Sequence, residues 1–249
     1  MEYWKKYRDD LYKQVYMFEE FPSESLTRLG EERPSEENEM QERFRQSVCR
    51  ARGMIEQYAL CNDWEYFGTF TLNKEIRDRT DLDAFRKDFV KLVQNTKRDT
   101  GQKIDFLLVP ELHKDGENWH MHGLFNNLPE KILIEYRKDE GLPGYIRKSL
   151  VEGKRLYFWE KYQKKFGWNV VEPVRERDRA ARYITKYVGK GMYDVAAVVD
   201  SGKHLYYVSK GLKKAEKIKP PAVDRRQTDL ICTYEKQYEY CIIRWYKMK

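Results

Sequence analysis

The feature that most constrains the fold is a predicted β-hairpin near the middle of the chain. Residues 104–113 and 118–126 are rich in aliphatic and aromatic side chains, which favours two strands. The segment between them contains Asp115 and Gly116, which are typical turn residues. Strands joined by so short a turn run antiparallel. Because helices and further strands alternate irregularly around this hairpin, the sequence predicts an α+β fold rather than a doubly wound parallel sheet.

The second strand of the hairpin carries two histidines on one face. His120 and His122 flank Met121, and side chains two apart in a strand point to the same side. We predict a register in which Glu111 faces His122. The same register pairs His113 with His120, so that all four side chains share one face. Two imidazoles and a carboxylate are suitable ligands for a divalent metal ion.

A second constellation lies in a predicted helix over residues 177–189. One face of this helix carries two tyrosines and two lysines at positions i, i+3, i+4 and i+7, namely Tyr183, Lys186, Tyr187 and Lys190. A nearby ammonium group favours the ionised form of a phenol and attracts phosphate. A deprotonated tyrosine is a competent covalent nucleophile. With a divalent metal to polarise a phosphodiester, it would form a phosphotyrosine bond and conserve the energy needed to rejoin the strand.

These motifs resemble those of the HUH endonuclease superfamily, in particular rolling-circle replication initiators of the two-tyrosine type from phages and plasmids. Residues 67–72 are similar to the first motif of that family, and His120-Met121-His122 matches its histidine motif. Residues 183–190 match its tyrosine motif, and the three motifs occur in the expected order. The resemblance spans about residues 44–212.

The resemblance implies a central five-stranded antiparallel sheet flanked by helices, an RRM-like arrangement. It also implies an enzyme that nicks single-stranded or hairpin origin DNA and keeps the 5′ phosphate on a tyrosine. Tyr187 would be the main nucleophile, and Tyr183 a second nucleophile or an assistant. Lys186 would position the scissile phosphate. The chain lacks a P-loop motif, so a host or phage helicase would act in trans.

The remaining candidate site residues fall into three groups. The implied ligands of Mg²⁺ or Mn²⁺ are His120, His122 and Glu111. Residues expected behind the ligands or against DNA are His113, Lys190 and Arg182. Basic residues that would contact the DNA backbone are Arg43, Arg50, Arg52 and Lys210, although a solvated helix face explains the three arginines equally well.

Composition agrees with a nucleic-acid-binding protein. The 249 residues carry a net charge of +7 and include 19 tyrosines, which supply cations for phosphates and rings for unpaired bases. The same composition is also compatible with a well-solvated basic protein that binds no nucleic acid. The four cysteines form no C-x-x-C pair, and neither a signal sequence nor a long apolar run is visible. We therefore expect a cytoplasmic protein of a prokaryotic host, with reduced thiols and no membrane contact.

The chain is predicted to have three parts. Residues 1–40 are an N-terminal helix over residues 1–18, with an apolar stripe at i+4 spacing, and a mobile linker over residues 21–39. Residues 41–215 are the endonuclease domain, and residues 216–249 are an extension with a strand packed on that domain. Predicted helices cover residues 39–60, 81–98 and 156–166, with Thr80 as the N-cap of the second, and predicted strands cover 66–72, 170–175 and 204–209.

The sequence is also compatible with several alternatives. A transposase or a mobilisation relaxase would use the same chemistry on the same fold. A non-catalytic repressor would bind origin DNA with a strong salt dependence and without metal. An iron oxygenase with two histidines and a carboxylate would leave the tyrosine helix unexplained. The histidines alone are equally consistent with hydrogen-bonded side chains on a polar strand, and the tyrosines with a core contact.

Overall fold

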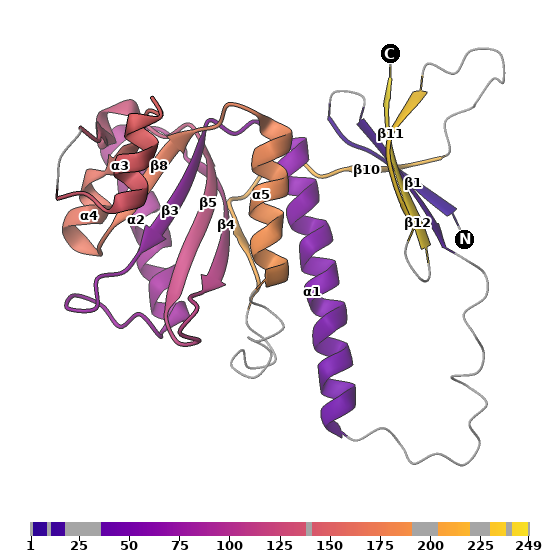
Figure 1. Ribbon diagram of the computed structural model, residues 1–249, viewed down its shortest axis with the longest axis horizontal. Helices are drawn as coiled ribbons and strands as arrows, with labels where there is room; N and C mark the ends of the chain where they lie inside the picture. The colour runs from indigo at the N-terminus through magenta and orange to yellow at the C-terminus, as the bar shows by residue number, and fades with distance from the viewer. Residues whose placement is uncertain are drawn as a thin grey trace.

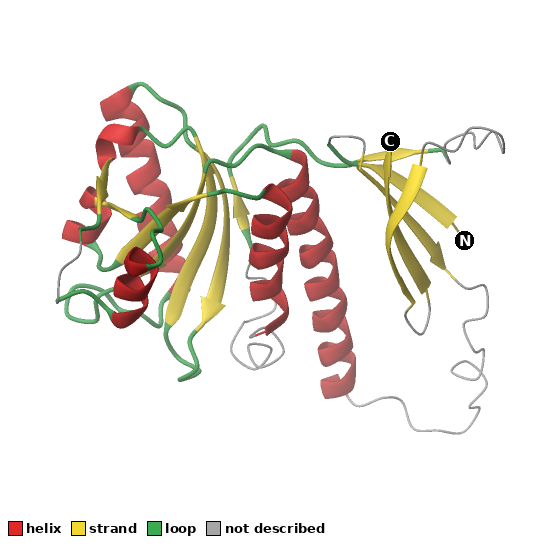
Figure 2. Ribbon diagram, turned by 45° about the horizontal axis from the view of Figure 1, so that its top comes forward, coloured by secondary structure: helices red, strands yellow, loops and turns green. Residues whose placement is uncertain are grey.

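The computed structural model describes residues 2–8, 11–17, 36–137, 141–190, 204–219, 230–237 and 241–248. Within these ranges the chain forms two antiparallel sheets, with helices packed on and between them (Figures 1 and 2). The larger sheet has the strand order β6-β7-β8-β3-β5-β4-β9, and the smaller one the order β10-β1-β2-β12-β11. The predicted α+β class is confirmed, and the central sheet has seven strands where five were expected.

The seven-stranded sheet and its helices follow the predicted elements closely. Its strands are β3 (Tyr66–Thr71), β4 (Asp105–Leu112), β5 (Trp119–Asn126), β6 (Leu133–Glu135), β7 (Tyr157–Trp159), β8 (Asn169–Pro173) and β9 (Tyr207–Val208). The helices are α1 (Glu36–Cys61), α2 (Leu82–Thr100), α3 (Gly144–Val151), α4 (Glu160–Lys165) and α5 (Arg177–Lys190), with a 3-10 helix η2 (Glu130–Ile132). The predicted helix over residues 156–166 was wrong at its start, because β7 pairs there with β6 and β8.

Alternating side chains place a hydrophobic core on each face of the large sheet. Phe70 and Phe125 point to the face covered by α2 and α4, where the Phe70 ring contacts Phe89 and Tyr162. Phe67, three residues before Phe70, points to the opposite face, which α1 and α5 cover. Burying one such aromatic side chain stabilises the fold by about 1.5–3 kcal/mol. The two cores therefore fix α5 against the face that carries the odd-numbered residues of β3.

Two facing glycines let the aromatic core close beneath β3 and β5. Gly68 pairs with Gly123 across these strands. A Cβ atom on Gly68 would lie 2.5 Å from the Phe70 ring, and one on Gly123 would lie 2.6 Å from the Phe125 ring. Real Cβ atoms do not approach rings so closely, so any larger residue would displace the core. The glycine of the first sequence motif thus has a packing role.

Helix α2 begins one residue later than predicted. The side chain of Asp81, rather than Thr80, caps it by accepting a hydrogen bond from the backbone N–H of Ala84 at 2.9 Å. Thr80 instead donates its hydroxyl to Asp78 at 2.7 Å. Gly101, with φ of 74°, ends the helix in the left-handed conformation that glycine adopts most readily.

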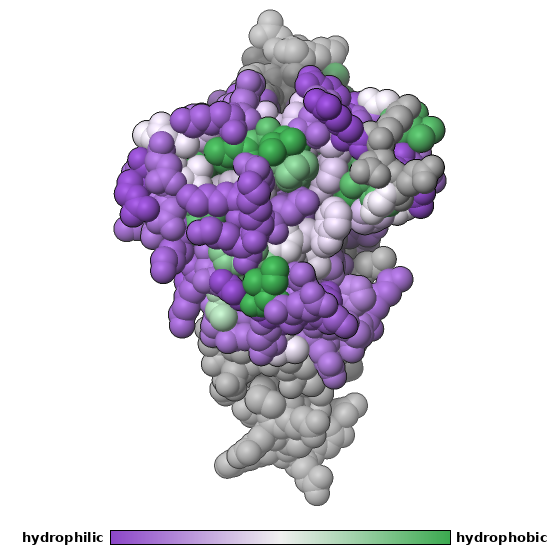
Figure 3. Space-filling model, turned by 90° about the vertical axis from the view of Figure 1, so that its left-hand side faces the viewer, coloured by the Kyte–Doolittle hydropathy of each residue, from purple (hydrophilic) through white to green (hydrophobic). Residues whose placement is uncertain are grey.

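The surface near α3 and α4 is mostly hydrophilic, with a few separate hydrophobic patches (Figure 3). The large apolar contacts instead lie between the layers, in the two cores of the central sheet. Among the described residues, no helix combines the length and the apolar character that crossing a membrane requires.

The two ends of the chain together form the second sheet. Its strands are β1 (Glu2–Lys6), β2 (Leu11–Met17), β10 (Glu216–Ile218), β11 (Leu230–Gln237) and β12 (Cys241–Met248). The predicted helix over residues 1–18 was therefore wrong, because β2 pairs with β1 on one side and β12 on the other. The C-terminal extension adds its strands to this sheet and not to the central one. Of the predicted linker, residues 36–39 begin α1 and residues 21–35 lie outside the described ranges.

Ion pairs fasten the small sheet to α1 and α5. Lys13 on β2 donates to Glu56 on α1 at 2.6 Å. Asp63, just after α1, accepts from Arg8 beside β1 and from Arg177 at the start of α5. Tyr7 is buried at this junction. The small sheet is thus connected through one carboxylate to the helix that carries the two tyrosines.

Cys61 provides a measurable test of this junction. The thiol is buried, and burial raises its pKa to about 11, so about one thiol in a thousand is ionised at pH 8. We expect maleimide to label exposed Cys49 and Cys232 rapidly and Cys61 slowly, as followed by peptide mass spectrometry. Asp63→Ala should accelerate Cys61 labelling by loosening the sheet. Equal rates at Cys61 and Cys49 in the unmodified protein would contradict the docked arrangement.

Candidate active site

The predicted hairpin is present, in a different register from the one expected. Glu111 pairs with His120, and Val109 pairs with His122, so β4 is shifted by two residues. A shift by two keeps every side chain on its predicted face. Glu111, His120 and His122 therefore still project toward α5. His113 falls beyond the end of β4, where its Nδ1 pairs with Asp115 at 3.0 Å.

Two threonines of β3 contact the histidines, each at the Nδ1 atom of one imidazole ring. The hydroxyl of Thr71 lies 2.8 Å from Nδ1 of His120, and the hydroxyl of Thr69 lies 3.2 Å from Nδ1 of His122. This follows from the pairing of β3 with β5, which places each threonine opposite its histidine. With Nδ1 engaged in this way, the Nε2 atom of each ring is left for another partner. Neither threonine was predicted as a site residue.

The donor atoms of this cluster fit a divalent cation. Nε2 of His120 is buried and has no hydrogen-bond partner among the described residues. Nε2 of His122 lies 2.7 Å from Oε2 of Glu111. Metal-binding histidines usually have their other ring nitrogen hydrogen-bonded, as both rings do here. As placed, no three His, Cys, Asp or Glu side chains in the described ranges are arranged to hold an ion, and a cation would replace the hydrogen bond between Glu111 and His122.

The environment of His120 keeps its imidazole neutral. Burial, reinforced by the neighbouring His122, His113 and Arg79 side chains, lowers the pKa of His120 to about 4. A neutral ring presents a lone pair, which a metal ligand requires. Arg79 also has its Nε atom buried without a partner among the described residues, so this cation lies beside the cluster with an unused donor. No sequence pattern singled out Arg79.

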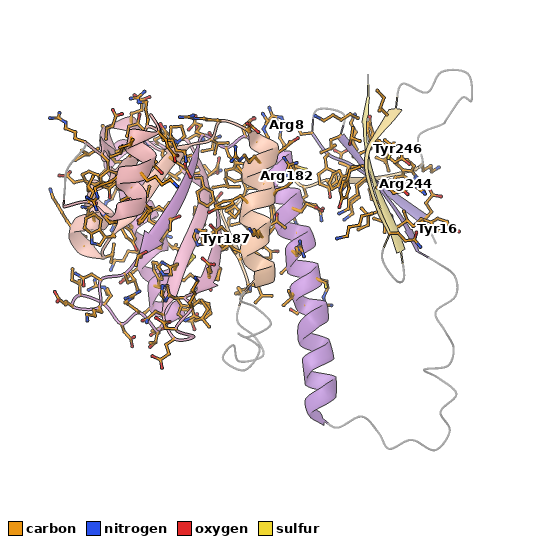
Figure 4. The ribbon with its side chains drawn as sticks, viewed as in Figure 1. Arg8, Tyr16, Arg182, Tyr187, Arg244 and Tyr246 are labelled. Carbon is orange, nitrogen blue, oxygen red and sulfur yellow. The ribbon has the colours of Figure 1, made fainter. Side chains whose placement is uncertain are left out.

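Helix α5 places Tyr187 over His122, with Tyr183 beside Tyr187. The ring of Tyr187 stacks on that of His122, with centroids 3.7 Å apart and planes 9° apart. Tyr183 meets Tyr187 edge to face at 5.1 Å, and it meets Phe67 edge to face at 5.2 Å. Figure 4 shows Tyr187 between α5 and the sheet. Tyr183 is 48% exposed, so it forms the outer member of the pair.

The phenol of Tyr187 is protonated in this arrangement. Burial, and then the hydrogen-bonded neighbour Tyr183 and the carboxylates of Glu111 and Glu172, raise its pKa above the ordinary value of 10. We expected Lys186 to favour the ionised phenol. The side chain of Lys186 is instead exposed, and the net shift of the pKa of Tyr187 is upward. Among the described side chains no cation lowers the pKa of Tyr187, so ionising this phenol needs positive charge from another source.

A cleft of about 440 Å³ opens next to Tyr183. Its apolar lining includes Phe67 and Tyr183, so the cleft begins at the outer tyrosine of the pair. Four cations line it against two glutamates: Lys154, Arg155, Arg175 and Arg179 against Glu172 and Glu176. Lys154 and Arg155 form ion pairs with Glu152 and Glu135. Arg175 and Arg179 are exposed and have no ion-pair partner in the described ranges, so their charge is available to an anion.

The other predicted residues lie around or away from this site. Arg182 on α5 and Arg50 and Arg52 on α1 are exposed. Lys210 is exposed after β9, and its backbone carbonyl accepts from Lys103 at 3.1 Å. The side chains of Arg43 and Lys190 lie outside those that the structure describes. The ring centroid of His113 lies 5.1 Å from that of His120, which makes it a neighbour of the cluster.

The fold and the site define an α+β protein in which a two-tyrosine helix packs over a histidine pair on an antiparallel sheet. Residues 65–192, just over half of the chain, match the family described as replication-associated protein ORF2, and the chain belongs to this family. The match includes the hairpin, the histidines and both tyrosines, and excludes the small sheet. No curated protein and no solved structure shows a significant match.

Proposed function

We propose that this chain is a metal-dependent, site-specific single-stranded DNA endonuclease and strand transferase. It nicks an origin through a covalent 5′-phosphotyrosine intermediate and so initiates rolling-circle replication in the cytoplasm of a prokaryotic host. The observation that carries this proposal is the stacking of Tyr187 on His122, because it brings a phenol beside a histidine and a carboxylate that could bind a metal ion. Membership of a replication-associated family supports the biological role.

Tyr187 is assigned as the nucleophile. Its oxygen attacks the phosphorus of the scissile phosphodiester and loses its proton to water. The bond between phosphorus and the 3′ oxygen breaks, and that oxygen takes up a proton to give a free 3′ hydroxyl. The 5′ phosphate remains on Tyr187. Attack by a 3′ hydroxyl on this phosphotyrosine reverses the step and rejoins the strand, and Tyr183 would serve as a second nucleophile or an assistant.

His120, His122 and Glu111 would hold Mg²⁺ or Mn²⁺. When bound, the cation would neutralise charge on the phosphodiester and favour the ionised form of a nearby phenol. Such a contribution is needed, since the pKa of Tyr187 is raised by burial and by neighbouring carboxylates. Arg79 would donate its unused Nε–H to a phosphate oxygen at the same place.

The cleft beside Tyr183 would receive the strand next to the scissile phosphate. Arg175 and Arg179 supply cations for its phosphates, and Phe67 and Tyr183 supply rings for a base. Phe67 and Thr69 lie two residues apart on one strand face, so the cleft begins about 7 Å from the threonine that holds His122. Lys186 is exposed on the same helix as Tyr183 and would contact the phosphate backbone.

The direct test is adduct formation. The protein is incubated with labelled single-stranded origin DNA and Mg²⁺ or Mn²⁺, then resolved under denaturing conditions. We expect a covalent protein–DNA band and, by mass spectrometry, a 5′ nucleotide on the α5 peptide. Absence of any adduct across a library of phage and plasmid origin sequences would refute the proposal and leave the non-catalytic repressor.

A transposase or mobilisation relaxase remains the second candidate, because it would use the same nucleophile and ligand set. The family match favours replication over these uses. Rejoining assays separate them, since a transposase would join the cut strand to a different target DNA. A helicase to unwind the duplex would be a separate partner protein.

A further inference from the structure

Trp168, just before β8, is the most exposed tryptophan of the protein. All six tryptophans lie in the described ranges, and the side chain of Trp168 is 44% exposed. Trp245 is half-buried, and the other four are at most 6% exposed. Within the described ranges the indole of Trp168 makes no hydrogen bond and no ring contact. Tryptophan usually buries a large area in a core or an interface, so this indole is available to a flat ligand.

The backbone fixes Trp168 beside the end of β3. The N–H of Thr71 donates to the carbonyl of Trp168 at 2.8 Å. The N–H of Asn73 donates to the carbonyl of Phe166 at 2.7 Å, so the pairing of β3 with β8 continues beyond the start of β8. Gly167, with φ of 146°, packs so closely that a Cβ atom there would lie 2.5 Å from this part of β3. Only glycine allows such an approach, which holds the segment against β3.

Trp168 lies in the same cross-strand row as two of the proposed metal ligands. It is opposite Thr71, which pairs with His120, which in turn pairs with Glu111. Side chains directly opposite each other on antiparallel strands share one face, with Cβ atoms about 5 Å apart. The hydroxyl of Thr71 contacts His120, so this face is the one that carries the candidate site. The exposure of Trp168 next to buried Asn169 fits the same alternation.

The cleft beside the outer tyrosine and the indole of Trp168 lie at opposite ends of one stretch of sheet. Phe67, which lines the cleft, is four residues before Thr71 on β3, a distance of about 14 Å. Between them lies Thr69, whose hydroxyl contacts His122. β8, β3 and β5 lie side by side beneath this path (Figure 1). A strand that reaches from the cleft to Trp168 therefore passes His122 and the tyrosine stacked on it.

Arg79 supplies a cation at the Trp168 end of this path. The loop of residues 73–81 carries three cations and three carboxylates, so it does not repel a phosphate overall. Arg79 is the cation of this loop whose charge acts on His120, and its Nε atom is buried without a partner among the described residues. Glu111, the carboxylate in the same row, is assigned to the metal ion. An indole for a base and a guanidinium for a phosphate are the two groups that bind a single strand.

We propose that Trp168 is a stacking platform for an unpaired base of the substrate strand, on the side of the scissile phosphate opposite the cleft. The inference rests on the proposed nicking function for the identity of the strand. A base held on the indole and a neighbouring nucleotide held in the cleft would keep the phosphate between them over the histidines. Trp168 binds the DNA in this arrangement and takes no part in making or breaking bonds.

The first measurement is tryptophan fluorescence during titration with an oligothymidylate of about 12 nucleotides, which contains no origin to cleave. Because the other tryptophans are less exposed, most of the quenching on binding should come from Trp168. In Trp168→Phe this quenching should be largely lost, while anisotropy of the labelled strand still reports binding. Phenylalanine keeps a ring, so the affinity should fall by only about two- to fivefold.

Trp168→Ala removes the ring and should lower the affinity about tenfold or more. The carbonyl that pairs with Thr71 is retained, so the fold should be preserved. With origin DNA, single-turnover adduct formation in this variant should be slow at low DNA concentration and approach that of the unmodified protein at saturation. Tyr234→Ala is the matched control, because Tyr234 is 52% exposed on β11, outside the family match. It should change neither affinity nor rate.

Equal affinity of Trp168→Ala and the unmodified protein would overturn this inference, and so would quenching that persists in Trp168→Phe. The second result decides the matter if the alanine variant is poorly folded. An equal loss of affinity in Tyr234→Ala would also count against it, because any exposed ring would then act alike. A protein that shows quenching from Trp168 but forms no adduct with any origin would lack only the nicking function.

Discussion

Tyr187→Phe is expected to abolish the covalent DNA adduct, with a loss of more than about a thousandfold in the rate of its formation. Phenylalanine retains the ring that stacks 3.7 Å above His122, so folding and DNA binding should be preserved. Only the attacking oxygen is removed. The measurement is single-turnover adduct formation, with anisotropy to confirm that DNA affinity is unchanged.

Tyr183→Phe provides the internal control. Tyr183 is half exposed and touches Tyr187 rather than the histidines, so the first cleavage should proceed in this variant. Transfer to a second strand should be impaired, because that step needs a second phenol on the same face. If Tyr183→Phe abolished the first adduct and Tyr187→Phe did not, the two roles would be exchanged. An adduct that survives the double substitution would exclude both tyrosines.

The sequence predicts which side chains of the site share a face of a strand or helix. It does not predict which of them contact one another across elements. Alternation in β5 put His120 and His122 on one side, and helical spacing in α5 put Tyr183 and Tyr187 together. Alternation repeats every two residues, so it cannot distinguish registers that differ by two. The predicted pairing of Glu111 with His122 was therefore wrong in register. Glu111 pairs with His120 instead, and its carboxylate still lies 2.7 Å from Nε2 of His122.

The N-terminal segment shows a second limit of prediction from sequence, because its secondary structure depends on distant strands. Its apolar residues recur at intervals of four, which fits the stripe of a helix and equally fits one face of a strand. Apolar residues at a spacing of three, Trp4 and Tyr7 and then Tyr12 and Val15, add to the helical pattern without forming a helix. The choice is made by β12, more than two hundred residues away, which pairs with β2 along its whole length. Partners so distant leave no local pattern, and the contribution of Arg79 beside His120 was invisible for the same reason.

His120→Ala is expected to remove high-affinity metal binding and, with it, adduct formation. Nε2 of His120 is buried without a partner among the described residues, so this proposed ligand atom has no other contact to maintain there. Isothermal titration with Mn²⁺ measures the first effect without DNA, and adduct assays with and without EDTA measure the second. We expect a loss of more than about a hundredfold in both. Unchanged Mn²⁺ affinity in His120→Ala would refute the assigned ligand set.

Thr71→Val tests whether the hydroxyl beside His120 contributes to metal binding by orienting the imidazole ring. The substitution keeps the shape of the side chain and removes the hydroxyl that lies 2.8 Å from Nδ1 of His120. Loss of such an orienting hydrogen bond should weaken Mn²⁺ binding about 10- to 100-fold while excess Mn²⁺ restores adduct formation. Thr185→Val is the control, since its hydroxyl donates to the carbonyl of Ala181 within α5. If both threonine variants bound Mn²⁺ normally, the histidines would be ordered by the strands alone, and the hydroxyls of β3 would have no part in the site.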